Sequence, residues 1–173
     1  MKTRKPTNMN FWRRYGWVIA ACVAVAAALA AVTLMLSPPV PPADAPLVTV
    51  YKSPTCGCCN KWVRHLQEAG FAANAEHLAD LDAVRAELGV PTKYAACHTA
   101  VVEGYVIEGH VPAADIKRLL AERPKARGLA VPGMPIGSPG MEGPNPQAYD
   151  VRLLHEDGTV SVYAQHNANQ HSR

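Results

Sequence analysis

Residues 47–62 read LVTVYKSPTCGCCNKW, and this stretch decides the fold of the part of the chain that follows it. Its first five residues are apolar, β-branched or aromatic without polar alternation, which is typical of a strand buried on both faces of a sheet. After the cysteines, residues at helical spacing predict a helix that ends at Gly70; they are Trp62, Val63, Leu66 and Ala69. The three cysteines therefore lie in a turn from a strand into a helix.

The position of Cys56, Cys58 and Cys59 in that turn suggests their chemistry. The first N–H groups of a helix have no backbone partner and favour negative charge, so they stabilise a thiolate. A thiolate is the nucleophile of disulfide exchange and also a soft metal ligand. The turn therefore supports either redox chemistry or metal binding.

The first 36 residues differ in composition from the rest of the chain. Residues 1–15 carry five cations and no acid, and residues 16–36 are an unbroken run of 21 uncharged, mostly apolar residues. About 20 such residues span a bilayer, and a positively charged flank stays in the cytoplasm. We predict an uncleaved signal-anchor followed by an exported domain. A signal peptide with its cleavage site at Ala28-Leu29-Ala30 is the alternative.

The chain is predicted to divide into five segments. Residues 1–15 form a cytoplasmic basic segment, 16–36 the transmembrane signal-anchor, and 37–46 a stiff, extended, proline-rich linker. Residues 47–166 form one domain, long enough to bury a single core, and residues 167–173 form a disordered tail. The expected location is the bacterial inner membrane, crossed once, with the domain in the periplasm.

Charge and cysteine content narrow the classes of function. Acids outnumber cations beyond residue 36, although the whole chain has a net charge of +3, so we expect no nucleic-acid partner. Four of the five cysteines lie outside the predicted membrane segment. Two structural disulfides in an oxidising compartment are one interpretation of this even number. The adjacent Cys58 and Cys59 are poorly suited to two such disulfides.

The sequence predicts further elements up to residue 124. A strand over 71–78 precedes a short helix over 80–88. Strands at 99–103 and 105–108 form an antiparallel hairpin around Gly104, and a third helix begins at Pro112 and ends before Pro124.

The C-terminal part is predicted to contain a loop and a second hairpin. The loop, residues 128–143, is rich in glycine and proline and displays Met134 and Met141, with core packing of Met134 as the alternative. The hairpin joins strands 151–155 and 159–163.

The order strand, helix, strand, helix, strand, strand, helix resembles the thioredoxin and glutaredoxin fold over residues 47–123. Cys56 and Cys59 match the C-x-x-C motif of that fold. In that family a cis-proline precedes the third strand and packs against the two thiols, whereas residues 96–99 here read ACHT. The resemblance therefore implies that Cys97 and His98 lie near Cys56 and Cys59. Three or four sulfur and nitrogen donors at one turn favour a metal site over disulfide exchange.

Several separated motifs resemble one specific family, the domain of unknown function 411. They are YKSPTCGCC at 51–59, CHTA at 97–100, GYVIEGHVP at 104–112, VPGMP at 131–135 and GSPGME at 137–142. Members of this family are exported, are predicted to bind metal, and are repeatedly linked to copper handling. The resemblance implies a metal-binding protein more than any particular reaction.

The candidate metal ligands are Cys56, Cys59, Cys97, Cys58, His98, Met134 and Met141. Two of them have an alternative interpretation: Cys58 as a bystander that points into the helix, and His98 as a hydrogen-bonded structural residue. Thioethers suit Cu(I) and do not form disulfides, which favours the methionines as accessory ligands. We predict a capping or surface role for His110. Trp62 is predicted in the core or as a lid beside the thiols.

The sequence supports three functional hypotheses. The first is a membrane-anchored periplasmic domain that binds Cu(I) and sequesters it or passes it to another exported copper protein, without catalysing a reaction. The second is a thiol–disulfide oxidoreductase with Cys56 as the attacking thiol and Cys59 as the resolving thiol. The third is a closed structural zinc site, which would not depend on methionine.

Overall fold

The computed structural model of the chain describes residues 9–36 and 42–167. The chain divides into two compact units between residues 38 and 39. The predictions for residues 1–8, 37–41 and 168–173, which concern the basic segment, the linker and the tail, lie outside the described residues.

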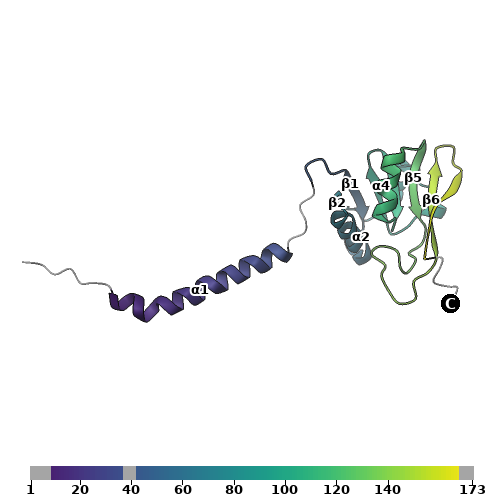
Figure 1. Cartoon of the computed structure of the whole chain (residues 1–173). Coiled ribbons are helices and arrows are strands. Elements are labelled where there is room, and N and C mark those ends of the chain that lie inside the picture. Colours follow the sequence, from purple (N-terminus) through teal and green to yellow (C-terminus); the bar gives the residue numbers. More distant parts are fainter. Residues whose placement is uncertain (1–8, 37–41, 168–173) are drawn as a thin grey trace, which may run out of the picture. The chain divides into compact units, whose positions relative to one another are not determined.

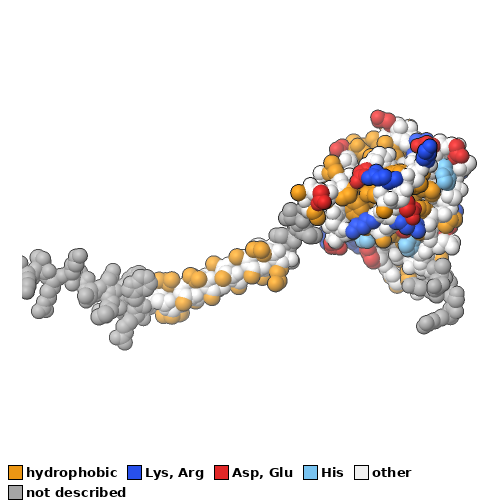
Figure 2. All heavy atoms as spheres, turned by 45° about the horizontal axis from the view of Figure 1, so that its top comes forward, with side chains coloured by type: hydrophobic (Ala, Val, Ile, Leu, Met, Phe, Trp, Pro, Cys, Tyr) orange, Lys and Arg blue, Asp and Glu red, His pale blue; other side chains and the backbone are white. Residues whose placement is uncertain are grey.

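The first unit contains helix α1, Met9–Leu36, which begins upstream of the predicted start at residue 16 (Figure 1). Its segment Tyr15–Met35 has 21 residues and a mean hydropathy of 2.6, so it is long and apolar enough to cross a membrane. A signal sequence has the same properties. Figure 2 shows hydrophobic side chains along the visible face of this helix.

The second unit is a mixed α/β domain around one seven-stranded sheet, in the order β2-β1-β3-β4-β5-β6-β7 (Figure 1). The strands are β1 Leu47–Lys52, β2 Ala72–His77, β3 His98–Val102, β4 Tyr105–Gly109, β5 Ala126–Val131, β6 Tyr149–His155 and β7 Val160–His166. The two parallel pairs, β1 with β2 and β4 with β5, are each joined by a helix, because parallel neighbours need a long crossover.

The four helical segments of the domain fall where the chain crosses between strands. They are α2 Gly57–Glu68, α3 Asp82–Glu87, the short 3-10 helix η1 Thr92–Tyr94, and α4 Ala113–Glu122. The predicted order of elements up to α4 is therefore present. The predicted hairpins correspond to β3 with β4 and β6 with β7, both antiparallel.

The main core includes buried side chains of the sheet, α2 and α4. Trp62 and Leu66 of α2 join Ile116 and Leu119 of α4 and strand residues such as Ile107 in one cluster. Burying each such side chain contributes about 1.5–3 kcal/mol. The Trp62 Nε1–H donates to the Val111 carbonyl at 2.8 Å, so the buried indole has no unmade hydrogen bond. Trp62 is thus a core residue.

His65 links the two core helices. Its Nε2 accepts a hydrogen bond at 3.1 Å from the amide of Ala113, the first residue of α4, which has no partner within its own helix. Burial lowers the pKa of His65. The neutral ring that results is the form that can accept this bond.

The predicted loop at 128–143 begins later than expected, because residues 128–131 belong to β5. Leu129 and Val131 have no exposed surface, and burial of these apolar residues beside β4 outweighs the turn preference of Gly128. Gly128 is required for another reason, since a Cβ atom there would overlap the Val106 carbonyl oxygen.

The loop between β5 and β6 is fixed by its own hydrogen bonds and by contact with α2. The Ser138 hydroxyl donates to the Pro135 carbonyl at 2.8 Å, and the Met141 amide donates to the Ser138 carbonyl at 2.9 Å. A Cβ atom on Gly140 would lie 2.7 Å from the Cys58 carbonyl oxygen and 2.9 Å from the Trp62 amide nitrogen. The loop backbone therefore lies directly against the first turns of α2.

The Gly140→Ala substitution is expected to destabilise the domain by about 1–3 kcal/mol more than Gly133→Ala, because only Gly140 touches backbone atoms of α2. Gly133 is the matched control: it lies in the same loop with φ +74° against +84° at Gly140, but a Cβ atom there meets nothing within 4 Å. Thermal unfolding of both full-length variants measures the difference. Equal losses of stability would show that backbone strain alone is responsible.

Candidate metal centre

The cysteines occupy the predicted turn between β1 and α2. Cys56 is the N-cap of α2, and the Cys59 amide donates to its Sγ at 3.4 Å. Cys56 and Cys59 form a disulfide with their Cα atoms 5.4 Å apart. The half-buried Cys56 faces the solvent side of this pair and the fully buried Cys59 its inner side. The spacing of the C-x-x-C motif is therefore that of a redox-active pair as well as of a ligand pair.

Cys58 and Cys97 extend this pair into a group of four sulfur atoms. Cys58 Sγ lies 3.4 Å from Cys56 Sγ and 3.9 Å from Cys97 Sγ. Cys58 thus points toward the other thiols, which differs from the bystander interpretation. The ligand atoms of all four cysteines lie within 4.8 Å of one another.

Cys97 also meets two histidines. Its Sγ lies 3.0 Å from His110 Nε2 and 3.3 Å from His98 Nδ1. Cys97 precedes β3 and His110 follows β4, so the antiparallel pairing of these strands brings the two residues together. We call Cys56, Cys58, Cys59, Cys97, His98 and His110 the sulfur–imidazole cluster.

The tautomer of His110 follows from its second nitrogen. His110 Nδ1 lies 2.7 Å from the Pro139 carbonyl, which only accepts hydrogen bonds, so Nδ1 carries the proton. Nε2 then presents a lone pair toward Cys97. A carbonyl that holds one imidazole nitrogen while the other faces the ligand position is the usual arrangement around metal-binding histidines.

His98 is the most deeply buried histidine side chain among those that face Cys97, together with His110. It has no exposed surface, its ring centroid lies 4.3 Å from that of Trp62 and 5.0 Å from that of His110, and its Nε2 has no hydrogen-bond partner among the described residues. Burial, followed by the neighbouring His110, holds the pKa of His98 well below its usual value. The ring is therefore neutral, with one polar atom available.

Burial also sets the protonation of Cys97 and His110. Burial, followed by the neighbouring Cys58, raises the pKa of the Cys97 thiol to about 12, and burial lowers the pKa of His110. At neutral pH the Cys97 thiol therefore donates its hydrogen to the lone pair of His110 Nε2. A soft metal ion that replaces this hydrogen would find one sulfur and one nitrogen donor already facing each other.

The predicted methionine ligands lie on the β5–β6 loop. Met134 is 50% exposed, as expected for a displayed side chain, and Met141 is half-buried directly after Gly140. The short contacts of the cluster join cysteine and histidine atoms. A metal-binding role for the two thioethers therefore stays a prediction.

His110 is the residue of the cluster that sequence reasoning missed. The predicted surface role was wrong, because His110 has no exposed surface. The predicted hairpin around Gly104 contained the necessary information: Thr99 pairs with Glu108, so the same antiparallel register extended outward places Cys97 opposite His110.

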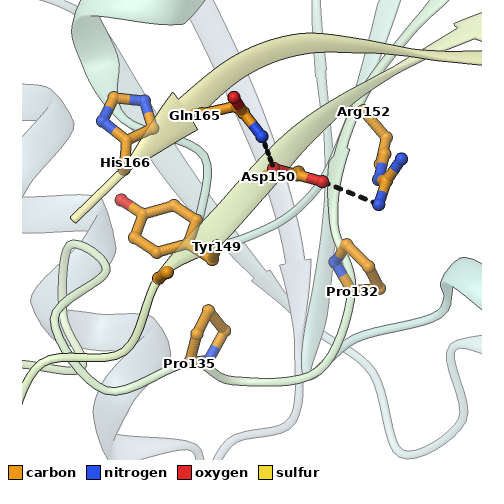
Figure 3. A pocket seen from close by; sticks show the side chains of 8 residues that line it. Pro132, Pro135, Tyr149, Asp150, Arg152, Gln165 and His166 are labelled. Carbon is orange, nitrogen blue, oxygen red and sulfur yellow. Dashed lines mark hydrogen bonds and ion pairs between the residues drawn. The ribbon is translucent and has the colours of Figure 1, made fainter. Parts of the chain in front are cut away.

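A cavity of about 360 Å³ lies away from the cluster, beside β6 and β7 (Figure 3). Its charged side chains already have partners: Asp150 accepts from Gln165 at 2.9 Å and pairs with Arg152 at 2.7 Å. His166, on its rim, pairs with Asp115 at 2.6 Å. The lining contains no cysteine, and we assign no function to it.

Comparison with known proteins finds relatives linked to copper. The model of a family described as "Protein of unknown function, DUF411" matches residues 94–141, which include Cys97, His98 and His110. Two solved structures, described as "Copper resistance protein copG", Form 2 and Form 1, are both 46% identical to the chain and cover 70% of it. The chain covers 98% of each, with TM-scores of 0.68 and 0.67 respectively. No curated protein matches the sequence significantly.

The protonated state of Cys97 predicts a pH dependence of metal binding. Because the pKa of this thiol is about 12, binding as a thiolate releases one proton at neutral pH, whereas neutral His110 releases none. The affinity of the reduced protein for Cu(I) should rise with pH between pH 6 and 8. In Cys97→Ala the affinity should rise less steeply, because one proton fewer is released on binding. The difference between the two slopes should be about a factor of ten in affinity per pH unit. Equal slopes in competition titrations would contradict binding through Cys97.

Proposed function

The chain belongs to the DUF411 family and is similar to the copper resistance protein CopG, and we propose that it binds Cu(I) at the sulfur–imidazole cluster. It would sequester the ion or deliver it to another exported copper protein. The observation that carries this proposal is the contact between Cys97 Sγ and His110 Nε2 at 3.0 Å, with the opposite nitrogen held by the Pro139 carbonyl.

The donor set supports copper. Thiolates suit Cu(I) as well as zinc, and imidazole suits both metals, so up to four sulfurs and two imidazoles offer more donors than one ion needs. Cys56, Cys58 and Cys97 are each half-buried, which leaves the cluster accessible from solvent on one side. Access of this kind suits transfer by ligand exchange, whereas a structural zinc site is closed.

We extend the proposal to the fold class and to location. A thioredoxin-like core from β1 to α4 is supported by the order of elements and by the C-x-x-C motif at the start of α2. Anchoring of the domain in the periplasm by α1 is supported by the length and hydropathy of Tyr15–Met35. The cleaved, soluble periplasmic form is the alternative.

A second candidate function is thiol–disulfide exchange, and the Cys56–Cys59 disulfide is the observation that favours it. In the reduced form a Cys56 thiolate would attack a substrate disulfide, and Cys59 would resolve the mixed disulfide. The two functions require different residues, because this exchange needs neither Cys97 nor His110.

Cu(I) binding is tested by anaerobic titration of the reduced, full-length protein in detergent against a chromophoric chelator. The Cys97→Ala and His110→Ala variants should each lose at least tenfold in affinity, about 1.4 kcal/mol, because each loses a donor of the central pair. Met134→Ala should lose less, as an accessory ligand. His155→Ala is the matched control, since this histidine bonds the Ser161 hydroxyl at 2.9 Å on the outer hairpin.

The result separates the candidate functions. Weak binding by the wild-type protein, or unchanged binding by Cys97→Ala, contradicts the copper proposal. Disulfide-exchange activity that survives in Cys97→Ala then supports the second candidate. Tight zinc binding that is insensitive to Met134→Ala would instead indicate a structural zinc site.

Membrane anchoring predicts that the protein stays with the membrane fraction after an alkaline carbonate wash, because a spanning helix is not extracted by high pH. Deletion of residues 16–36 should leave the shortened chain in the cytoplasm. Mass spectrometry of the mature protein checks the alternative: a soluble periplasmic form that lacks the first 30 residues would show that the helix is a cleaved signal peptide.

A further inference from the structure

The backbone next to Cys97 is held by buried side chains instead of by regular structure. Ala96 lies between the 3-10 helix η1 and β3, so neither ladder nor helix supplies partners for its polar groups. The Ala96 amide donates to Glu108 Oε1 at 2.6 Å, and the Ala96 carbonyl accepts from Arg85 Nη2. Both polar groups of this one residue are thus bound by charged side chains.

Arg85 and Glu108 come from different elements and also bind each other. Arg85, near the end of α3, donates from Nε to Glu108 Oε1 at 3.0 Å. Their side chains are 11% and 0% exposed. Glu108 Oε2 accepts from the Thr99 hydroxyl, and Arg85 Nη1 donates to Asp82 at 3.4 Å. The pair therefore ties α3, β3 and β4 to the segment that precedes Cys97.

A third contact fixes the side chain of Ala96. Gly109 has φ +72°, and a Cβ atom there would lie 2.7 Å from the Ala96 Cβ. The Ala96 methyl group therefore packs against the backbone of Gly109, the residue before His110. The positions of Cys97 and His110 are coupled through this contact and through Glu108, which also belongs to β4.

The burial of this ion pair needs an explanation other than stability. Removing two charges from water costs several kcal/mol, and apolar replacements of buried pairs are often neutral or stabilising. The guanidinium group of Arg85 is planar and rigid, so its separate nitrogens donate to Glu108 and to the Ala96 carbonyl in fixed directions. The pair is better explained by what it positions than by the stability it adds.

We propose that Arg85 and Glu108 are positioning residues of the metal centre, which fix Ala96 and thereby hold Cys97 Sγ against His110 Nε2. This inference rests on the proposed Cu(I) function. In this proposal the ion pair sets the position of Cys97 and does not itself contact the metal.

The test uses a charge-neutral double variant, Arg85→Met with Glu108→Gln, called the clamp variant. Removing both charges avoids an unpaired buried ion, which would unfold the protein for an unrelated reason. The glutamine introduced at position 108 can still accept from the Ala96 amide, whereas the Ala96 carbonyl loses its donor. We expect the reduced, full-length clamp variant to bind Cu(I) at least tenfold more weakly than wild type.

A double-mutant cycle shows whether the loss acts through Cys97. In a Cys97→Ala background the clamp substitutions should change Cu(I) affinity less than about twofold, because the residue that they position no longer carries a sulfur donor. Equal losses with and without Cys97, or no loss in the clamp variant, would overturn the proposal. Asp115→Asn is the matched control: this buried carboxylate pairs with His166 and Arg118 but touches no cysteine in the described contacts, so its substitution should lower stability alone.

A second measurement needs no copper and therefore separates failure of this inference from failure of the proposed function. In the reduced, metal-free protein, iodoacetamide labelling of Cys97, followed by peptide mass spectrometry, should be at least fivefold faster in the clamp variant and unchanged in Asp115→Asn. If wild type does not bind Cu(I), the proposed function fails and the labelling rate alone decides the positioning role. Unchanged labelling in the clamp variant would then overturn it.

Discussion

The antiparallel register of β3 and β4 is the constraint on which the rest of the site depends. With Thr99 opposite Glu108, Cys97 and His110 meet beyond the ends of the two strands, and Thr99 and Glu108 bond each other two residues further into the ladder. A shift of the register by one residue would move every side chain of one strand to the other face. The positive φ of Glu103 and Gly104 at the turn fixes this register.

Alternation along the same strands divides the polar groups between two faces of the sheet. His98 of β3 shares its face with Ala100 and Val102, which belong to the main core, so its ring packs on Trp62. Thr99 and Glu108 point to the opposite face, where Arg85 of α3 donates to Glu108 and Glu108 accepts from Thr99. The cluster therefore has support from both sides of the sheet.

The sequence was sufficient for the parts of the structure that follow from local patterns. The strand-to-helix turn of Cys56, the hairpin around Gly104 and the helix after Pro112 follow from apolar spacing and turn chemistry. The burial of His110 and the Arg85–Glu108 pair did not emerge, because they depend on which elements pack against each other, and a polar residue gives no local sign of burial. Strand β5, Ala126–Val131, was not predicted at all, for the same reason: its neighbours, not its composition, make it a strand.

The disulfide and the sulfur–imidazole cluster share sulfur atoms, which constrains how the two candidate functions relate. Cys56 and Cys59 can supply thiolates only when their bond is reduced, whereas Cys58, Cys97 and His110 keep their donors in either state. A metal ion held by the reduced cysteines would block disulfide formation, and the disulfide would remove two of the four sulfur donors. Metal binding by all four cysteines and disulfide exchange by Cys56 and Cys59 would therefore exclude each other at any one time. Cys97 and His110, which exchange does not need, are the residues whose close contact supports the proposed metal binding.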